Sequence, residues 1–67
     1  MAEMPIKVGQ RFRTRGQYDV RVWEVEALFE DTERLPHARL CQVDRPNEFR
    51  TLACEVLLDS ARFSPVG

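Results

Sequence analysis

The 67-residue sequence predicts a small all-β domain, a five-stranded antiparallel barrel with one short helical turn near residues 55–59. Three observations support this fold class. A chain of this length forms one small domain. Its composition, 43% hydrophobic and 31% charged residues, is typical of folded globular proteins. Five short segments alternate apolar and polar residues with the period of a strand, and turn residues separate them. We expect residues 1–5 to be a flexible N-terminal lead-in and residues 6–66 to form the single domain.

The first predicted strand spans residues 6–14, where Ile6, Val8 and Phe12 share one face. Gly9 lies within it and predicts a bulge or bend. A turn over residues 15–19 follows, in which Gly16 can adopt a positive φ.

The second predicted strand spans residues 20–29. Trp23, Val25, Ala27 and Phe29 share one face, whereas the valines before Trp23 lie on the other. The apolar face therefore switches near 22–23, which predicts a bulge or sharp bend at that point. A small, tightly curved barrel needs such a bend.

A polar loop over residues 30–36 separates this strand from the third, which we expect over residues 37–44. Pro46 and Asn47 predict a turn over 45–48, and the fourth strand follows over 49–54. Residues 55–59 are predicted as a helical turn, although a prolonged strand is the alternative. A closing strand over 61–66 contains Pro65, which marks an edge or an end. We expect the sheet to close on itself, because closure protects strand edges.

This order of elements resembles the SH3-like barrels, including Tudor-like and KOW-like modules, and also small bacterial proteins of unassigned function. The resemblance is architectural and covers residues 6–66. It includes a glycine-containing first strand (VGQRFRT), a long bent second strand (VRVWEVEALFED), a helical turn (EVLLD) and a closing strand (ARFSPV). It implies binding of peptides, proteins or nucleic acid through the loops and one barrel face. Neither the peptide-binding signature of eukaryotic SH3 domains nor a methyl-lysine cage is identified, so the resemblance assigns no site residue.

Charge is segregated along the chain although the net charge is only −1. Residues 7–21 carry five basic side chains and one acidic, and residues 24–33 carry five acidic and no basic. A cationic strand can contact successive phosphates while an aromatic ring stacks on a base. The residues of this nucleic-acid interpretation are Lys7, Arg11, Arg13, Arg15 and Arg21, with Tyr18 or Trp23 as the stacking ring.

Cross-strand ion pairing explains the same pattern without a ligand, and we favour it. If Phe12 lies opposite Val25 in a hairpin, then Arg13 faces Glu24 and Arg11 faces the carboxylate at position 26. Trp23, placed between two valines, is likewise expected in the core rather than at a binding surface.

Catalytic and metal chemistry have little support. A structural zinc site needs four Cys or His ligands, and the chain has two cysteines, Cys41 and Cys54, and one histidine, His37. His37 and Cys41 would share a strand face about 13 Å apart, too far for a hydrogen-bonded pair. We predict no cofactor, no metal and no enzymatic activity, and expect both cysteines to be free thiols, with a single disulfide between them as the alternative. Catalysis by His37 with a cysteine is the remaining alternative.

The expected function is a non-enzymatic binding or interaction module whose partner is a protein, including a second copy of the chain. Nucleic-acid binding is the alternative. No membrane partner is expected, because no apolar run approaches the ~20 residues of a membrane span. The absence of a signal-peptide pattern and the low cysteine count predict a cytoplasmic location.

Overall fold

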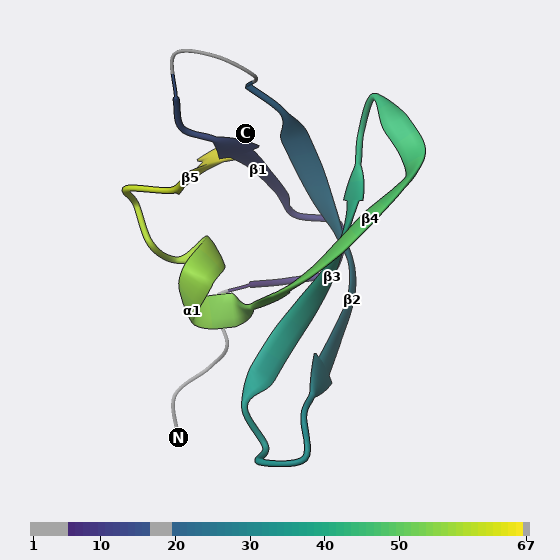
Figure 1. The fold of residues 1–67 in the computed structure, drawn as a ribbon, viewed down its shortest axis with the longest axis vertical. Coiled ribbons are helices and arrows are strands. Elements are labelled where there is room, and N and C mark those ends of the chain that lie inside the picture. The colour runs from purple at the N-terminus through teal and green to yellow at the C-terminus, as the bar shows by residue number, and fades with distance from the viewer. Residues whose placement is uncertain (1–5, 17–19, 67) are drawn as a thin grey trace.

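A computed structural model of the chain describes residues 6–16 and 20–66 (Figure 1). Five strands form one antiparallel sheet in the order β4-β3-β2-β1-β5, and a single helical turn precedes the last strand. The predicted small all-β fold is therefore confirmed. The elements are β1 (Arg11–Thr14), β2 (Val22–Glu30), β3 (Pro36–Gln42), β4 (Arg45–Ala53), α1 (Cys54–Leu57) and β5 (Phe63–Val66).

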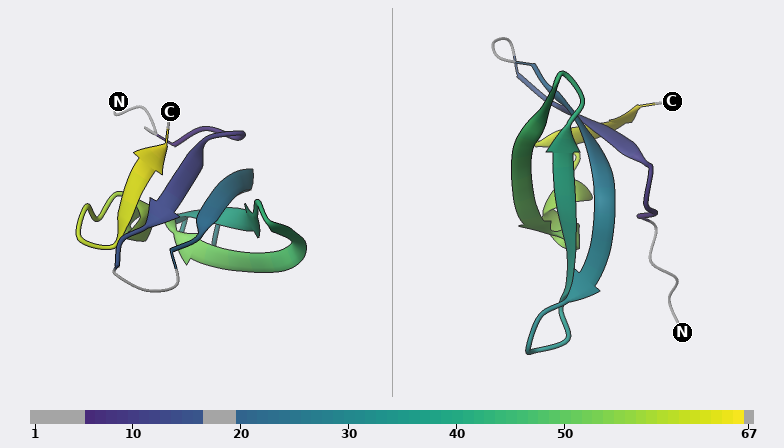
Figure 2. Two further views of the ribbon diagram at one scale, coloured as in Figure 1. Left: turned by 90° about the horizontal axis from the view of Figure 1, so that it is seen from above. Right: turned by 90° about the vertical axis from the view of Figure 1, so that its right-hand side faces the viewer.

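The sheet is strongly curved, and α1 connects its two end strands (Figures 1 and 2). β4 and β5 stand at opposite ends of the strand order. Within the described residues these two strands do not pair with each other, so the curved sheet is not closed by hydrogen bonds between its end strands. The chain turns into α1 directly after β4 and returns along β1 instead.

The core lies on the inner face of the curved sheet and includes α1. Trp23 is 4% exposed, which confirms its predicted place in the core. The buried apolar residues are Ile6, Phe12, Trp23, Val25, Ala38, Leu40, Cys54, Leu57 and Phe63, with Leu52 and Val56 packed against them.

The first strand is shorter than predicted because a turn occupies its N-terminal half. The backbone N–H of Gln10 donates to the carbonyl oxygen of Lys7 at 3.1 Å, and Gly9 has a φ of +93°, a conformation that favours glycine. The bend expected at Gly9 is confirmed. Ile6 nevertheless reaches the core from this turn.

The bulge in β2 lies further along the strand than predicted. Val25 pairs with Leu40, whereas Ala27 pairs with Arg39, so Glu26 is the extra residue on β2. The predicted switch near residues 22–23 is therefore wrong. Because a bulge reverses which face the following residues occupy, Ala27 leaves the core face on which it was expected.

The β3–β4 connection also differs from the prediction. The chain reverses at 43–44, and β4 already begins at Arg45, so the turn predicted over 45–48 is wrong as placed. Gln42 pairs with Arg45, whereas the preceding residue, Cys41, pairs with Phe49. Residues 46–48 lie between these two pairs and interrupt the regular register. The turn residues therefore produce an irregularity within β4 rather than its beginning.

The C-terminal elements follow the prediction with shifted bounds. The helical turn begins at Cys54 and ends at Leu57, which settles the choice between helix and prolonged strand. β5 begins at Phe63 rather than at residue 61. Pro65 lies in this strand, which is an end strand of the sheet, as its missing backbone donor predicts.

Candidate functional site

The basic residues of the nucleic-acid interpretation do not form one continuous row on the sheet. Lys7 lies in the turn before β1. Arg11 and Arg13 flank the buried Phe12 on β1 and are exposed on the opposite face, and Arg15 follows them in the chain. Arg21, by contrast, donates from Nη1 to Oε1 of the buried Gln42 at 3.3 Å, which directs it to the inner side of the sheet.

Of the two aromatic residues proposed to stack on bases, only Trp23 lies within the described residues. Tyr18 lies outside the described residues. Trp23 is buried, and its ring is covered by the Arg50 guanidinium, 5.1 Å from the ring centroid.

The pairing of β1 with β2 differs from the predicted register by two residues. Arg11 lies opposite Glu24 and Phe12 opposite Trp23, so the predicted pairing of Phe12 with Val25 is wrong. Nε of Arg11 donates to Oε1 of Glu24 at 3.0 Å. Arg11 therefore forms a cross-strand ion pair as expected, but with Glu24 rather than with Glu26. Arg13 lies opposite Val22 rather than opposite Glu24.

Two phenylalanines are exposed on the outer face of β2, β3 and β4. Phe29 and Phe49 are 45% and 46% exposed. Residues directly opposite one another in an antiparallel sheet point to the same side, and the rows on this face include Ala27–Arg39–Thr51. These rows border a hollow of about 440 Å³, here called the outer groove, which is lined by Ala27, Phe29, Arg39, Phe49, Arg50 and Thr51.

Arg39 lies between the two phenylalanines in this groove and is held from two sides. Its guanidinium lies 4.5 Å from the centroid of the Phe49 ring, within the range of a cation–π contact. Its Nε lies 3.2 Å from Oε2 of Glu26, the bulged residue of β2. The bulge thus supplies the carboxylate that orients Arg39 over Phe49.

At the far end of the groove, His37 continues the aromatic surface. The Phe29 and His37 rings are stacked, with centroids 5.8 Å apart. Nδ1 of His37 lies 2.9 Å from the carbonyl oxygen of Leu35. Because a carbonyl oxygen can only accept, Nδ1 carries the hydrogen, and Nε2 holds the lone pair when the ring is neutral.

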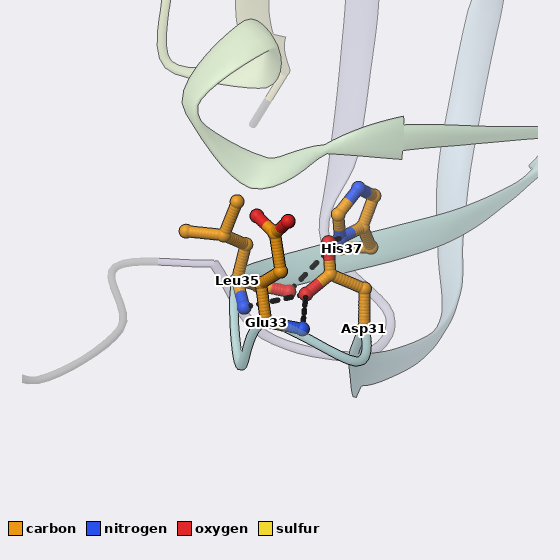
Figure 3. Close-up of polar contacts among 4 residues, drawn as sticks. All are labelled: Asp31, Glu33, Leu35 and His37. Atoms are coloured by element: carbon orange, nitrogen blue, oxygen red, sulfur yellow. Dashed lines mark hydrogen bonds and ion pairs between the residues drawn. The ribbon is translucent and has the colours of Figure 1, made fainter.

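The β2–β3 loop that supports His37 is organised by one carboxylate (Figure 3). Oδ1 of Asp31 accepts the backbone N–H groups of Glu33 and Leu35, each at 2.8 Å, and Oδ2 lies 4.0 Å from Nδ1 of His37. Such side-chain acceptors stabilise turns. These two hydrogen bonds fix the conformation of the loop, in which Arg34 adopts a φ of +63°.

Neither cysteine is placed to act as a nucleophile activated by His37. Cys54 is buried, and burial raises the pKa of its thiol above 9.0, which disfavours the reactive thiolate. Sγ of Cys41 donates to the carbonyl oxygen of Pro46 at 3.3 Å. Both thiols are free, as predicted. A pocket of about 160 Å³ beside His37 is lined by Asp31, Leu35, Pro36, Ala53 and Glu55, and no thiol borders it.

Residues 6–16 and 20–66 contain no group of three or more His, Cys, Asp or Glu side chains that could hold a metal ion. In the same ranges, no helix has the length and apolar character to cross a membrane.

Comparison with protein-family models, curated proteins and solved structures gives no match to this chain. The candidate site is therefore defined by the geometry of this structure alone. The sequence interpretation did not identify Phe29, Arg39 or Phe49 as site residues. Phe29 was assigned to the core face, because the bulge at Glu26 could not be located from the apolar pattern alone.

Proposed function

We propose that this chain is a non-enzymatic binding module of SH3-like architecture, and that its partner is a protein bound at the outer groove. The exposed pair Phe29 and Phe49, with Arg39 held between them, is the observation that carries the proposal. The architecture is supported by the five-stranded order and the helical turn before the last strand. The free thiols are compatible with a cytoplasmic location.

The residue types of the groove favour a protein ligand. Aromatic and arginine side chains contribute most of the binding energy at protein interfaces, because they bury large areas and also form directed contacts. Arg39 is already oriented by Glu26, so binding would immobilise few of its rotamers. An apolar side chain of the partner would pack on the exposed surface of Phe29 or Phe49, and a neighbouring carboxylate would pair with Arg39 or Arg50.

The position of the groove beside an edge strand supports an extended partner segment. β4 is at one end of the sheet and is exposed over most of its length. An edge strand has backbone groups that can pair with an added strand. We therefore infer that the partner presents an extended segment with alternating apolar and acidic residues.

Selection from a library of displayed random peptides tests this function. We expect enriched peptides to combine an apolar residue with Asp or Glu, and Phe49→Ala to weaken their binding at least about tenfold. Leu58→Ala is the matched control, since Leu58 is an exposed apolar residue outside the groove. Failure to enrich any peptide, or equal binding to the Phe49→Ala variant, would overturn the proposal.

The mass of the domain in light scattering, measured at increasing concentration, identifies whether the partner is a second copy. A mass that rises for the wild type but stays constant for Phe49→Ala would assign the groove to self-association. A constant monomer mass for both proteins would assign it to a different protein.

Nucleic-acid binding remains a second candidate because of two arginines. Arg13 and Arg15 are exposed, and within the described residues neither forms an ion pair. Together with Val20 and Ser64 they border a hollow of about 410 Å³. This function predicts oligonucleotide binding that falls steeply with salt and weakens in Arg13→Gln. Unchanged binding in that variant would exclude this surface.

A further inference from the structure

The two end strands of the sheet differ in how they are protected against pairing with another chain. β5 is four residues long and contains Pro65, which has no backbone donor. β4 is nine residues long, and its one proline, Pro46, is its second residue. Every residue of β4 after Pro46 therefore keeps its backbone N–H group. β4 is the end strand that can accept a further strand at its edge.

The side chains in the middle of β4 alternate between the two faces of the sheet. Phe49 and Thr51 line the outer groove, whereas Arg50 pairs with the buried Leu40. Glu48 and Arg50 both border a second hollow of about 310 Å³ on the inner side. Arg50 borders this hollow as well as the outer groove, as expected for a side chain at the edge of a sheet.

Glu48 and Arg50 place charges of opposite sign two residues apart on this edge. Neither forms an ion pair within residues 6–16 and 20–66, and the Arg50 guanidinium lies over the Trp23 ring. Charged residues on an edge strand usually oppose association. Because the signs differ here, a second β4 strand is either repelled or attracted, depending on its register.

The possible registers of a symmetric antiparallel β4–β4 pair can be compared directly. One residue lies on the two-fold axis and faces itself, and opposed residues share a face. With Phe49 on the axis, Glu48 of each copy faces Arg50 of the other. With Glu48 or Arg50 on the axis, that residue faces its own like charge. With Thr51 on the axis, Arg50 faces Leu52, and no charge is paired. Charge complementarity therefore selects Phe49.

We propose that the partner is a second copy of this chain, joined through the β4 edge with Phe49 on the two-fold axis. The inference rests on the proposed protein-binding function and names its partner. The segment Glu48-Phe49 has the acidic and apolar neighbours inferred for that partner. In this register the two Phe49 rings, each 46% exposed in the single chain, meet on the outer face, where paired aromatic rings attract one another.

Single charge reversals test the register. Glu48→Arg sets two guanidinium groups opposite each other at both facing pairs, and Arg50→Glu does the same with carboxylates. We expect each variant to weaken dimerisation at least about tenfold, measured from the mass in sedimentation equilibrium at increasing concentration. Glu33→Arg is the matched control and should dimerise like the wild type. It makes the same change of charge in the loop between β2 and β3, outside β4.

Mixing the two variants tests whether these residues face each other. In a mixed dimer, each facing pair again contains one carboxylate and one guanidinium. An equimolar mixture of Glu48→Arg and Arg50→Glu should therefore recover the dimer that neither variant forms alone. Arg50→Glu also removes the contact with Trp23, so thermal unfolding checks its fold. Glu48→Arg removes no side-chain hydrogen bond or ion pair within the described residues and keeps the test decisive.

A wild-type chain that stays monomeric up to about 1 mM would overturn the proposal. Dimerisation that is unchanged in Glu48→Arg, or folded variants whose mixture stays monomeric, would overturn it as well. Its failure is distinguishable from failure of the proposed function. A monomeric chain that still binds library-selected peptides through Phe49 loses only the second copy as its partner. A chain that neither dimerises nor binds such peptides loses the proposed function too.

Discussion

The Arg39 guanidinium lies 4.5 Å from the centroid of the Phe49 ring and so connects β3 with β4 on the outer face of the sheet. Arg39 stands opposite Thr51, whereas Phe49 stands opposite Cys41, so the contact is diagonal. We expect a double-mutant cycle with Arg39→Gln and Phe49→Leu to give a coupling of about 0.5–1 kcal/mol in the free energy of unfolding. Urea unfolding measures it, and strictly additive effects would show that the contact does not form in solution.

The Arg11–Glu24 ion pair tests the register of β1 against β2. Both side chains are about half exposed, so we expect a coupling of only about 0.2–1 kcal/mol that decreases in high salt. The sequence-based register would instead couple Arg13 with Glu24. Two parallel cycles, one with Arg11→Gln and one with Arg13→Gln, distinguish the registers. Coupling of Glu24 to Arg13 alone would contradict the structure.

The buried thiol of Cys54 predicts a loss of stability in alkaline solution. Burial raises the pKa of this thiol above 9.0, its ordinary value, so the folded protein holds the proton more tightly than the unfolded chain does. The resulting stabilisation is fully present below pH 9.0 and is lost as the pH rises through the folded-state pKa.

Urea unfolding at about pH 8 and about pH 10 measures this effect. Cys54→Ala should show a smaller loss between the two pH values than the wild type. An identical loss in the two proteins would show that other groups account for it. In the same samples, Cys41, which is partly exposed, should be alkylated faster than Cys54.

The Asp31 carboxylate is expected to determine the stability of the β2–β3 loop. It accepts two backbone hydrogen bonds, so Asp31→Ala should lower the free energy of unfolding by about 1–3 kcal/mol. Asp31→Asn keeps one acceptor oxygen and should lose less. Hydrogen exchange at the Leu35 amide is the local readout. Unchanged exchange in Asp31→Ala would mean that the loop is held by other contacts.

The strand pattern was predictable because each strand places apolar residues on the core face with a period of two. The same period made the register of β1 ambiguous. Sliding Phe12 from opposite Val25 to opposite Trp23 keeps both faces intact, since the shift is two residues. Apolar patterning and charge pairing therefore favoured the hairpin without fixing the partners.

The candidate site was harder to predict because it depends on the bulge at Glu26. The apolar residues of β2 continue in phase from Trp23 to Phe29 in the sequence, whereas the structure changes face after Val25. Pro46 and Asn47 misled the prediction for a related reason. They are turn-forming residues, yet the backbone accommodates them as an irregularity within β4. In both cases tertiary pairing decided between local conformations that the sequence permits equally.

Mapping of backbone amide resonances during titration with a library-selected peptide tests the proposed protein-binding function most directly. Our account predicts shifts concentrated on residues 27–29, Arg39 and 49–51, and their loss in Phe49→Ala. Shifts confined to residues 7–21 that disappear at high salt would contradict it, because they would place the ligand on the arginines of β1 instead.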